Sequence, residues 1–166
     1  IAYLQSLVHW DYQAFDFHPV LSRQDRMEAF ELLKSLKSNE SENDLVSLIE
    51  AETLLSAGEW NAAHEQFTVL LKNNSLNARE WFIRRNAGLA ISAMKLGKLD
   101  LAQAAAKEIY DLESGWEGLQ RLVAEIDADA GNVEGCQSLA AKLYESAAEN
   151  PKVVSWYSEL LKKIGQ

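Results

Sequence analysis

A chain of 166 residues, 48% hydrophobic and 25% charged, is long enough and apolar enough to bury a core, which excludes an intrinsically disordered protein. Its net charge of −9 disfavours nucleic acids and anionic membrane surfaces as partners, because the summed field repels polyanions. A single cysteine excludes an intramolecular disulfide. The sequence has no run of about 18 apolar residues, and we therefore expect no direct membrane insertion. The sequence begins with Ile1 rather than methionine, and we expect it to be part of a larger protein.

The N-terminal part, residues 1–43, predicts a divergent helical cap. Its first fifteen residues show helical apolar spacing, which ends at His18-Pro19 because proline disfavours a helical conformation in the residue before it. Ser22 is a suitable N-cap for a second helix that extends to about Lys37. The polar stretch that follows has no apolar periodicity and predicts a loop.

From Asp44 onwards the predicted helices form antiparallel pairs, and the first helix of each pair ends at a glycine. Glycine suits this place because a helix commonly ends with a residue of positive φ. The glycines concerned are Gly58, Gly97, Gly131 and Gly165. We expect repeat units at residues 44–77, 78–114 and 115–150, followed by a terminal helix at 151–165.

Residues 89–144 nearly repeat themselves with a shift of 34 positions. Leu89 returns as Val123, Ala102 as Cys136 and Ala106 as Ala140, so that small residues match small ones and aliphatic residues match aliphatic ones. A fixed period of this length is typical of helical solenoids, in which no helix pair buries its faces alone. We therefore predict an all-α, right-handed α-solenoid of three to four antiparallel helix pairs that forms one continuous domain.

A small residue in the first helix, a glycine turn and small residues on the second helix recur in each unit. They read Ala51…Gly58-Glu59-Trp60…Ala63…Phe67, then Leu89-Ala90…Gly97-Lys98-Leu99…Ala102…Ala106, then Val123-Ala124…Gly131-Asn132-Val133…Cys136…Ala140. This pattern resembles the tetratricopeptide repeat (TPR) family over residues 44–165. The sequence departs from the family by five extra residues between the first two units and by Pro19, which falls where an N-terminal repeat would have its first helix.

The resemblance implies that the first helices line a concave groove in which extended or helical peptides bind. Carried onto this sequence, it assigns to the groove Leu48, Glu52, Leu55, Arg84, Ala87, Ile91, Met94, Lys95, Arg121, Glu125 and Ala128.

Three of these groove residues are cations. Arg84 and Lys95 lie three helical turns apart and so share one helix face, and Arg121 lies about 10 Å away on the next first helix. Three converging cations would favour an acidic stretch or a C-terminal carboxylate in the ligand. Reversing Arg84 and Arg121 to Glu should then weaken binding by at least tenfold and leave thermal stability nearly unchanged, because exposed charges contribute little to folding. The alternative is that these charges only solvate the surface.

No residue pattern predicts catalysis or metal binding. The histidines are scattered, Cys136 replaces the small residue of its repeat, Asp127 and Asp129 point in different directions on one helix, and every glycine has a turn or capping explanation. The histidines are His9, His18 and His64. We therefore expect a protein that is not an enzyme and has neither a metal nor another cofactor.

The sequence favours a non-catalytic protein–protein interaction scaffold that binds a peptide or a partner helix. The alternative is a structural domain that oligomerises through its ends. Gly165 would end the first helix of a repeat and leave an apolar face around Trp156, Tyr157 and Leu160, which a second copy could cover. The sequence leaves the partner and the compartment open.

Overall fold

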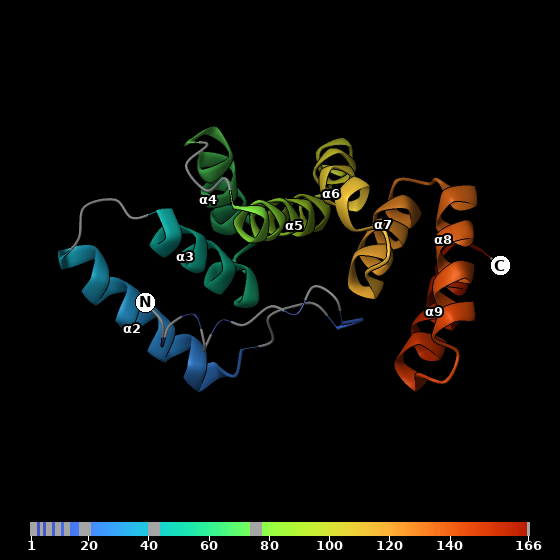
Figure 1. Ribbon diagram of the computed structural model, residues 1–166, viewed down its shortest axis with the longest axis horizontal. Helices are drawn as coiled ribbons and strands as arrows, with labels where there is room; N and C mark the ends of the chain where they lie inside the picture. The colour runs from blue at the N-terminus through green and yellow to red at the C-terminus, as the bar shows by residue number, and fades with distance from the viewer. Residues whose placement is uncertain are drawn as a thin grey trace.

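The structure, a computed structural model, describes residues 3, 5, 8, 11, 14–16, 21–39, 44–73 and 78–165. Every secondary-structure element with defined bounds that it describes is an α-helix (Figure 1), which confirms the predicted all-α class. In chain order the helices are α2 (Arg23–Asn39), α3 (Asp44–Ser56), α4 (Trp60–Asn73), α5 (Arg79–Lys95), α6 (Leu99–Glu113), α7 (Glu117–Asp129), α8 (Val133–Ser146) and α9 (Pro151–Lys163).

Each helix from α2 to α9 packs against the next one in the chain. In addition, α3 contacts α5, α5 contacts α7, and α7 contacts α9, so that these four helices form a continuous row. They are the helices that the sequence predicts as the first members of their pairs. Figure 1 shows the helices following one another along the long axis of the molecule.

The turns after α3, α5, α7 and α9 share one geometry. Each contains a glycine of positive φ, between 71° at Gly97 and 80° at Gly165. At the end of α5, the Gly97 amide donates to the Met94 carbonyl over 3.0 Å and the Lys98 amide donates to the Ala93 carbonyl over 2.9 Å. These bonds satisfy carbonyls that the helix end leaves open, and a residue with a Cβ atom would be strained at position 97.

Helix α5 lies at the centre of the core, since every residue from 83 to 94 is buried. Gly88 stands in the middle of this helix, and the prediction that every glycine serves a turn or a cap is wrong there. A Cβ atom at position 88 would lie 2.1 Å from Cζ of Phe67 in α4. The missing side chain therefore makes room for an aromatic ring between the two helices.

The predicted helix after Ser22 is present as α2, and the hydroxyl of Ser22 caps it by accepting the Asp25 amide over 3.1 Å. Val8 belongs to the same apolar cluster as α2, α3 and α5, whereas Phe15 belongs to the cluster of α8 and α9. The predicted helix in the first fifteen residues falls mostly outside the described residues, as does most of the predicted loop before Asp44.

Among the described helices, none is both long enough and apolar enough to cross a membrane.

Candidate functional site

Most of the predicted groove residues are buried. Those on α3 and α5 are Leu48, Glu52, Leu55, Arg84, Ala87, Ile91 and Met94, each at most 7% exposed. Val8 packs into this cluster from the N-terminal part of the chain, and α2 packs against α3. These side chains therefore do not line an open groove.

Arg84 forms a buried ion pair instead of facing a ligand. Its Nε donates to Oε1 of Glu52 over 2.6 Å, and its Nη2 donates to Oε2 of the same carboxylate. Glu52 is fully buried and Arg84 is 6% exposed. Burial raises the pKa of Glu52 to about 7, and the hydrogen bond and charge of Arg84 limit this rise. The expectation of an exposed Arg84, whose reversal would leave stability unchanged, is corrected by this burial.

The three predicted cations have separate surroundings. Arg84 contacts Glu52 in α3 and the ring of Trp81, whereas the Nζ of Lys95 is exposed and lies 5.9 Å from the ring centroid of Trp60 in α4. Arg121, on α7, contacts residues from the start of the chain. The structure therefore does not bring the three cations to one ligand position.

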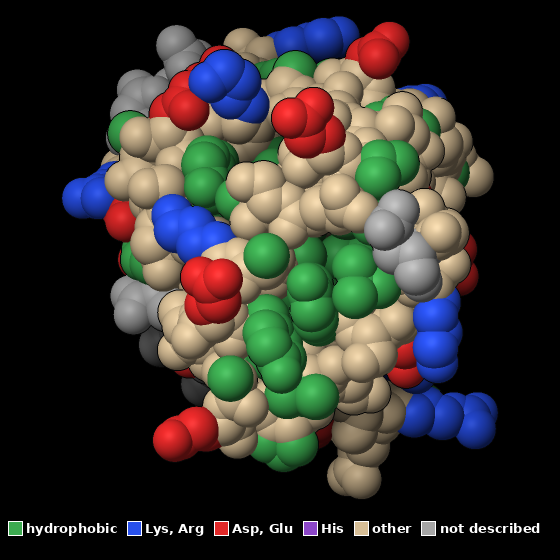
Figure 2. Space-filling model, turned by 90° about the vertical axis from the view of Figure 1, so that its right-hand side faces the viewer, with side chains coloured by type: hydrophobic (Ala, Val, Ile, Leu, Met, Phe, Trp, Pro, Cys, Tyr) green, Lys and Arg blue, Asp and Glu red, His purple; other side chains and the backbone are tan. Residues whose placement is uncertain are grey.

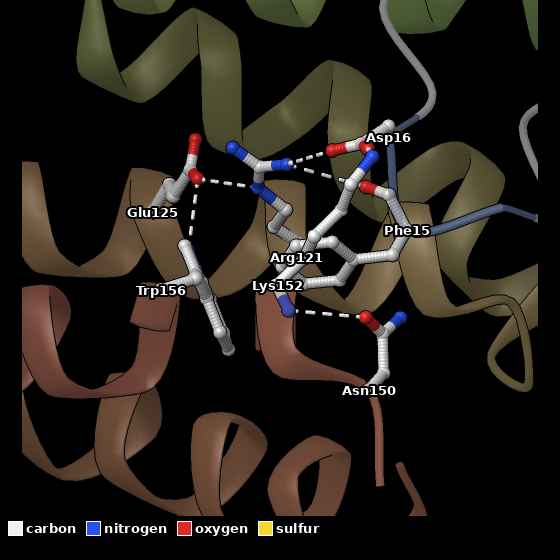
Figure 3. A network of polar contacts seen from close by, with 7 residues as sticks. All are labelled: Phe15, Asp16, Arg121, Glu125, Asn150, Lys152 and Trp156. Carbon is white, nitrogen blue, oxygen red and sulfur yellow. Dashed lines mark hydrogen bonds and ion pairs between the residues drawn. The ribbon is translucent and has the colours of Figure 1, made fainter. Parts of the chain in front are cut away.

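Arg121 instead contacts Phe15 and Asp16, which lie more than 100 residues earlier in the chain (Figure 3). Its guanidinium carbon lies 4.6 Å from the centroid of the Phe15 ring. Its Nη1 donates to the carbonyl oxygen of Phe15 and to Oδ1 of Asp16, both over 3.3 Å. One side chain thus contacts an aromatic ring, a main-chain carbonyl and a carboxylate.

Lys152, in the first turn of α9, binds the other oxygen of Asp16 through its Nζ. This hydrogen bond, more than any other contact, holds the pKa of Asp16 below its usual range, and the charges of Lys152 and Arg121 act in the same direction. The backbone amide of Lys152 donates to Asn150, the N-cap of α9, over 3.1 Å. Asp16 is therefore a carboxylate held between two helices.

Trp156 and Glu125 complete this arrangement. The Trp156 ring meets Phe15 edge to face, with centroids 5.5 Å apart and an interplanar angle of 76°. Oε1 of Glu125 accepts both Nε1 of Trp156, over 3.0 Å, and Nε of Arg121, over 2.8 Å. One carboxylate thus orients two of the groups that contact Phe15. We call Arg121, Glu125, Lys152 and Trp156 the Phe-Asp seat.

Sequence reasoning assigned Arg121 and Glu125 to the groove but missed Lys152, Phe15 and Asp16. Lys152 left a signal, because a cation in the first turn of a helix opposes the helix dipole and needs another reason to be there. Phe15 and Asp16 left none, since nothing local indicates which distant helices a segment contacts.

The apolar face predicted on α9 is partly used inside the molecule. Trp156 and Leu160 are buried, and Tyr157 is half-buried and stacked on Tyr144 with centroids 4.8 Å apart. Figure 2 shows that hydrophobic side chains nevertheless gather on the end of the molecule, where α8 and α9 lie.

Within the part of the chain that the structure describes, no group of three or more His, Cys, Asp or Glu side chains could hold a metal ion. Cys136 is buried, and this burial raises the pKa of its thiol, which disfavours the reactive thiolate. Arg85 is also buried, and its Nε and Nη1 have no hydrogen-bond partner. Its guanidinium carbon lies 5.4 Å from the centroid of the Phe82 ring, a cation–π contact.

A comparison with protein-family models finds no match for this chain, and comparisons with curated proteins and with solved structures find none either.

Proposed function

We propose that this chain is a non-catalytic protein–protein interaction module. In this proposal it is a right-handed solenoid of the tetratricopeptide-repeat kind, and its first helices hold an extended stretch of polypeptide. The row formed by α3, α5, α7 and α9 and the repeated glycine turns support this architecture. The Phe-Asp seat carries the functional part, because it is a place where first helices already hold a distant segment of chain.

The contacts at the seat are of the kind that recognise a peptide. Arg121 donates to a main-chain carbonyl, which any polypeptide offers, and to a carboxylate, which few positions offer. Phe15 is 5% exposed, and its ring contacts both Arg121 and Trp156. A buried aromatic anchor beside satisfied polar contacts is typical of protein interfaces.

Phe15 and Asp16 of the chain itself occupy this seat, so that it is not an open groove that a ligand could enter directly. A partner must therefore displace residues 15 and 16. A segment tethered to its site competes at an effective concentration in the millimolar range. If a free peptide bound the vacant seat with a Kd of about 100 µM, the tether would weaken its apparent binding about tenfold.

The test uses the full chain with Phe15→Ala and Asp16→Ala, which we call the vacated variant. A fluorescent peptide of residues 11–20 is titrated against it and against the wild type, with anisotropy as the readout. We expect the vacated variant to bind at least tenfold more tightly. Adding Arg121→Glu should abolish this binding, whereas Lys107→Glu, at an exposed lysine of α6, should leave it unchanged. A vacated variant that keeps its helical circular dichroism but does not bind at 1 mM peptide (about ten times the Kd assumed above) refutes the proposal.

The hydrophobic patch in Figure 2 favours a second candidate function, in which copies of the chain associate through the α8–α9 end. Tyr157, Leu161 and Ile164 are half-buried and follow one another on one side of α9. Light scattering over a concentration range tests this candidate. A mass that rises with concentration in the wild type but not in Leu161→Glu supports association, and a constant monomer mass excludes it.

A further inference from the structure

We infer that the partner segments recognised at the Phe-Asp seat carry an aromatic residue followed directly by an acidic residue. This inference rests on the proposed function, since it assumes that the seat binds polypeptide in trans. It goes further by stating the chemistry of the ligand, and Phe15-Asp16 is the example that the structure contains (Figure 3).

The first position requires an aromatic ring. Its two neighbours are the Arg121 guanidinium, 4.6 Å from the centroid, and the Trp156 ring, which it meets edge to face. Both interactions depend on the negative face of a π-system, and an aliphatic side chain of similar volume would lose them.

The second position requires a negative charge. The two oxygens of Asp16 bind different cations, Arg121 on α7 and Lys152 on α9. An asparagine has the same shape but offers only one acceptor oxygen and no charge, so one cation would lose its partner. The lowered pKa of Asp16 agrees with this, because the site favours the ionised form.

The order of the two residues follows from Arg121. The Nη1 of Arg121 donates to the carbonyl of the aromatic residue, Phe15, and to the carboxylate of the next residue, Asp16. The guanidinium also lies over the ring of Phe15. An acidic residue placed before the aromatic one would put its carboxylate on the other side of that carbonyl. The seat therefore distinguishes Phe-Asp from Asp-Phe, although both have the same composition.

The seat is also oriented before the ligand arrives. Glu125 fixes both Arg121 and Trp156 through contacts that do not involve residues 15 and 16. A site whose side chains are already held in place loses less conformational entropy on binding. The chain as a whole carries a net charge of −9, which opposes acidic ligands, so that the two cations of the seat localise an acidic residue there.

The experiment titrates the vacated variant, as the full chain, with four peptides of residues 11–20. They are the parent peptide, one with Phe15→Ala, one with Asp16→Asn, and one in which residues 15 and 16 exchange places. We expect each altered peptide to bind about tenfold more weakly than the parent, which corresponds to about 1.4 kcal/mol. The affinity of the parent should fall with salt more steeply than that of the Asp16→Asn peptide.

A double-mutant cycle then assigns the charge preference to the seat. The difference in affinity between the parent peptide and the Asp16→Asn peptide should become smaller when the vacated variant also carries Lys152→Met, because methionine cannot form an ion pair with the carboxylate. If the four peptides bind equally well, the aromatic–acidic inference is wrong while the interaction module stands. If none of the four binds to the folded variant, the proposed function fails as well.

Discussion

At the scale of single residues, Gly88 packs closely against the ring of Phe67. The added Cβ atom of an alanine would lie 2.1 to 2.5 Å from three carbons of the Phe67 ring, well inside van der Waals contact. Phe67 is fully buried, so its ring cannot turn outward without opening the core between α4 and α5. The glycine is therefore a packing requirement and not a helix signal.

We predict that Gly88→Ala lowers the free energy of unfolding by about 1–2 kcal/mol. Overpacking of a core typically costs about 1–3 kcal/mol, and contacts as short as 2.1 Å belong to the upper part of this range, so that the cost exceeds the gain of about 1 kcal/mol from the better helix propensity of alanine. Urea denaturation measures the change. The same substitution made together with Phe67→Leu should cost less than it does alone, since leucine leaves room for the methyl group. A Gly88→Ala variant as stable as the wild type would contradict this packing.

At the scale of helices, the Glu52–Arg84 pair joins α3 to α5 inside the core. Removing water from both charges is expensive, and such a pair contributes little net stability compared with apolar residues of the same size. Breaking it from one side is different, because the remaining charge stays buried. The pair therefore constrains which helices meet, since a shifted α3 would leave Arg84 without its carboxylate.

The raised pKa of Glu52 gives this pair a pH signature. In the folded chain Glu52 releases its proton, and so becomes the anionic partner of Arg84, only at about pH 7, whereas an unfolded glutamate releases it near pH 4.3. Because the folded state binds more protons between these values, rising pH lowers the stability that the group contributes. We predict that the wild type loses on the order of 2 kcal/mol relative to Glu52→Gln between pH 5 and pH 7.

Chemical denaturation at several pH values measures this difference. Glu50→Gln is the matched control, because Glu50 lies in the same helix, is only half-buried and pairs with Lys37 at the surface. Its difference from the wild type should stay nearly constant over the same range. A wild type that gains stability relative to Glu52→Gln as pH rises would mean that the ionised pair is favoured in the core.

The helices themselves were predictable, because their signals are local. Glycines of positive φ end α3, α5, α7 and α9, and Ser22 and Asn150 cap α2 and α9. The burial of the predicted groove residues was not predictable from the sequence, since Val8 and Phe15 pack against helices that are far away in the sequence. One clue was available: Glu52 lies between Leu48 and Leu55 on the apolar face of α3, where a carboxylate needs a buried cation.

At the scale of the whole molecule, the Phe-Asp seat joins the beginning of the chain to its last helix. Lys152 is mostly exposed, and exposed ion pairs contribute about 0–1 kcal/mol. The ion pair of Lys152 therefore adds little to this closure, and the burial of Phe15 supplies most of its stability. In a chain of net charge −9, the closure also places Asp16 against two of the 16 basic side chains.

Lys152 separates the stability of α9 from the holding of the N-terminal segment. A glutamate at this place would suit the helix dipole better than lysine, by about 0.3–1 kcal/mol, but would repel Asp16. We predict that Lys152→Glu keeps or raises the melting temperature while chymotryptic cleavage after Phe15 becomes about threefold faster, as the loss of an exposed ion pair allows. Lys162→Glu, at an exposed lysine in the last turn of the same helix, should leave this cleavage unchanged.

High salt should accelerate cleavage of the wild type and reduce the difference in cleavage rate between the wild type and Lys152→Glu, because salt screens the ion pair that only the wild type has. Equal cleavage rates for the wild type and Lys152→Glu at low salt would mean that Arg121 and Trp156 hold the segment without the lysine.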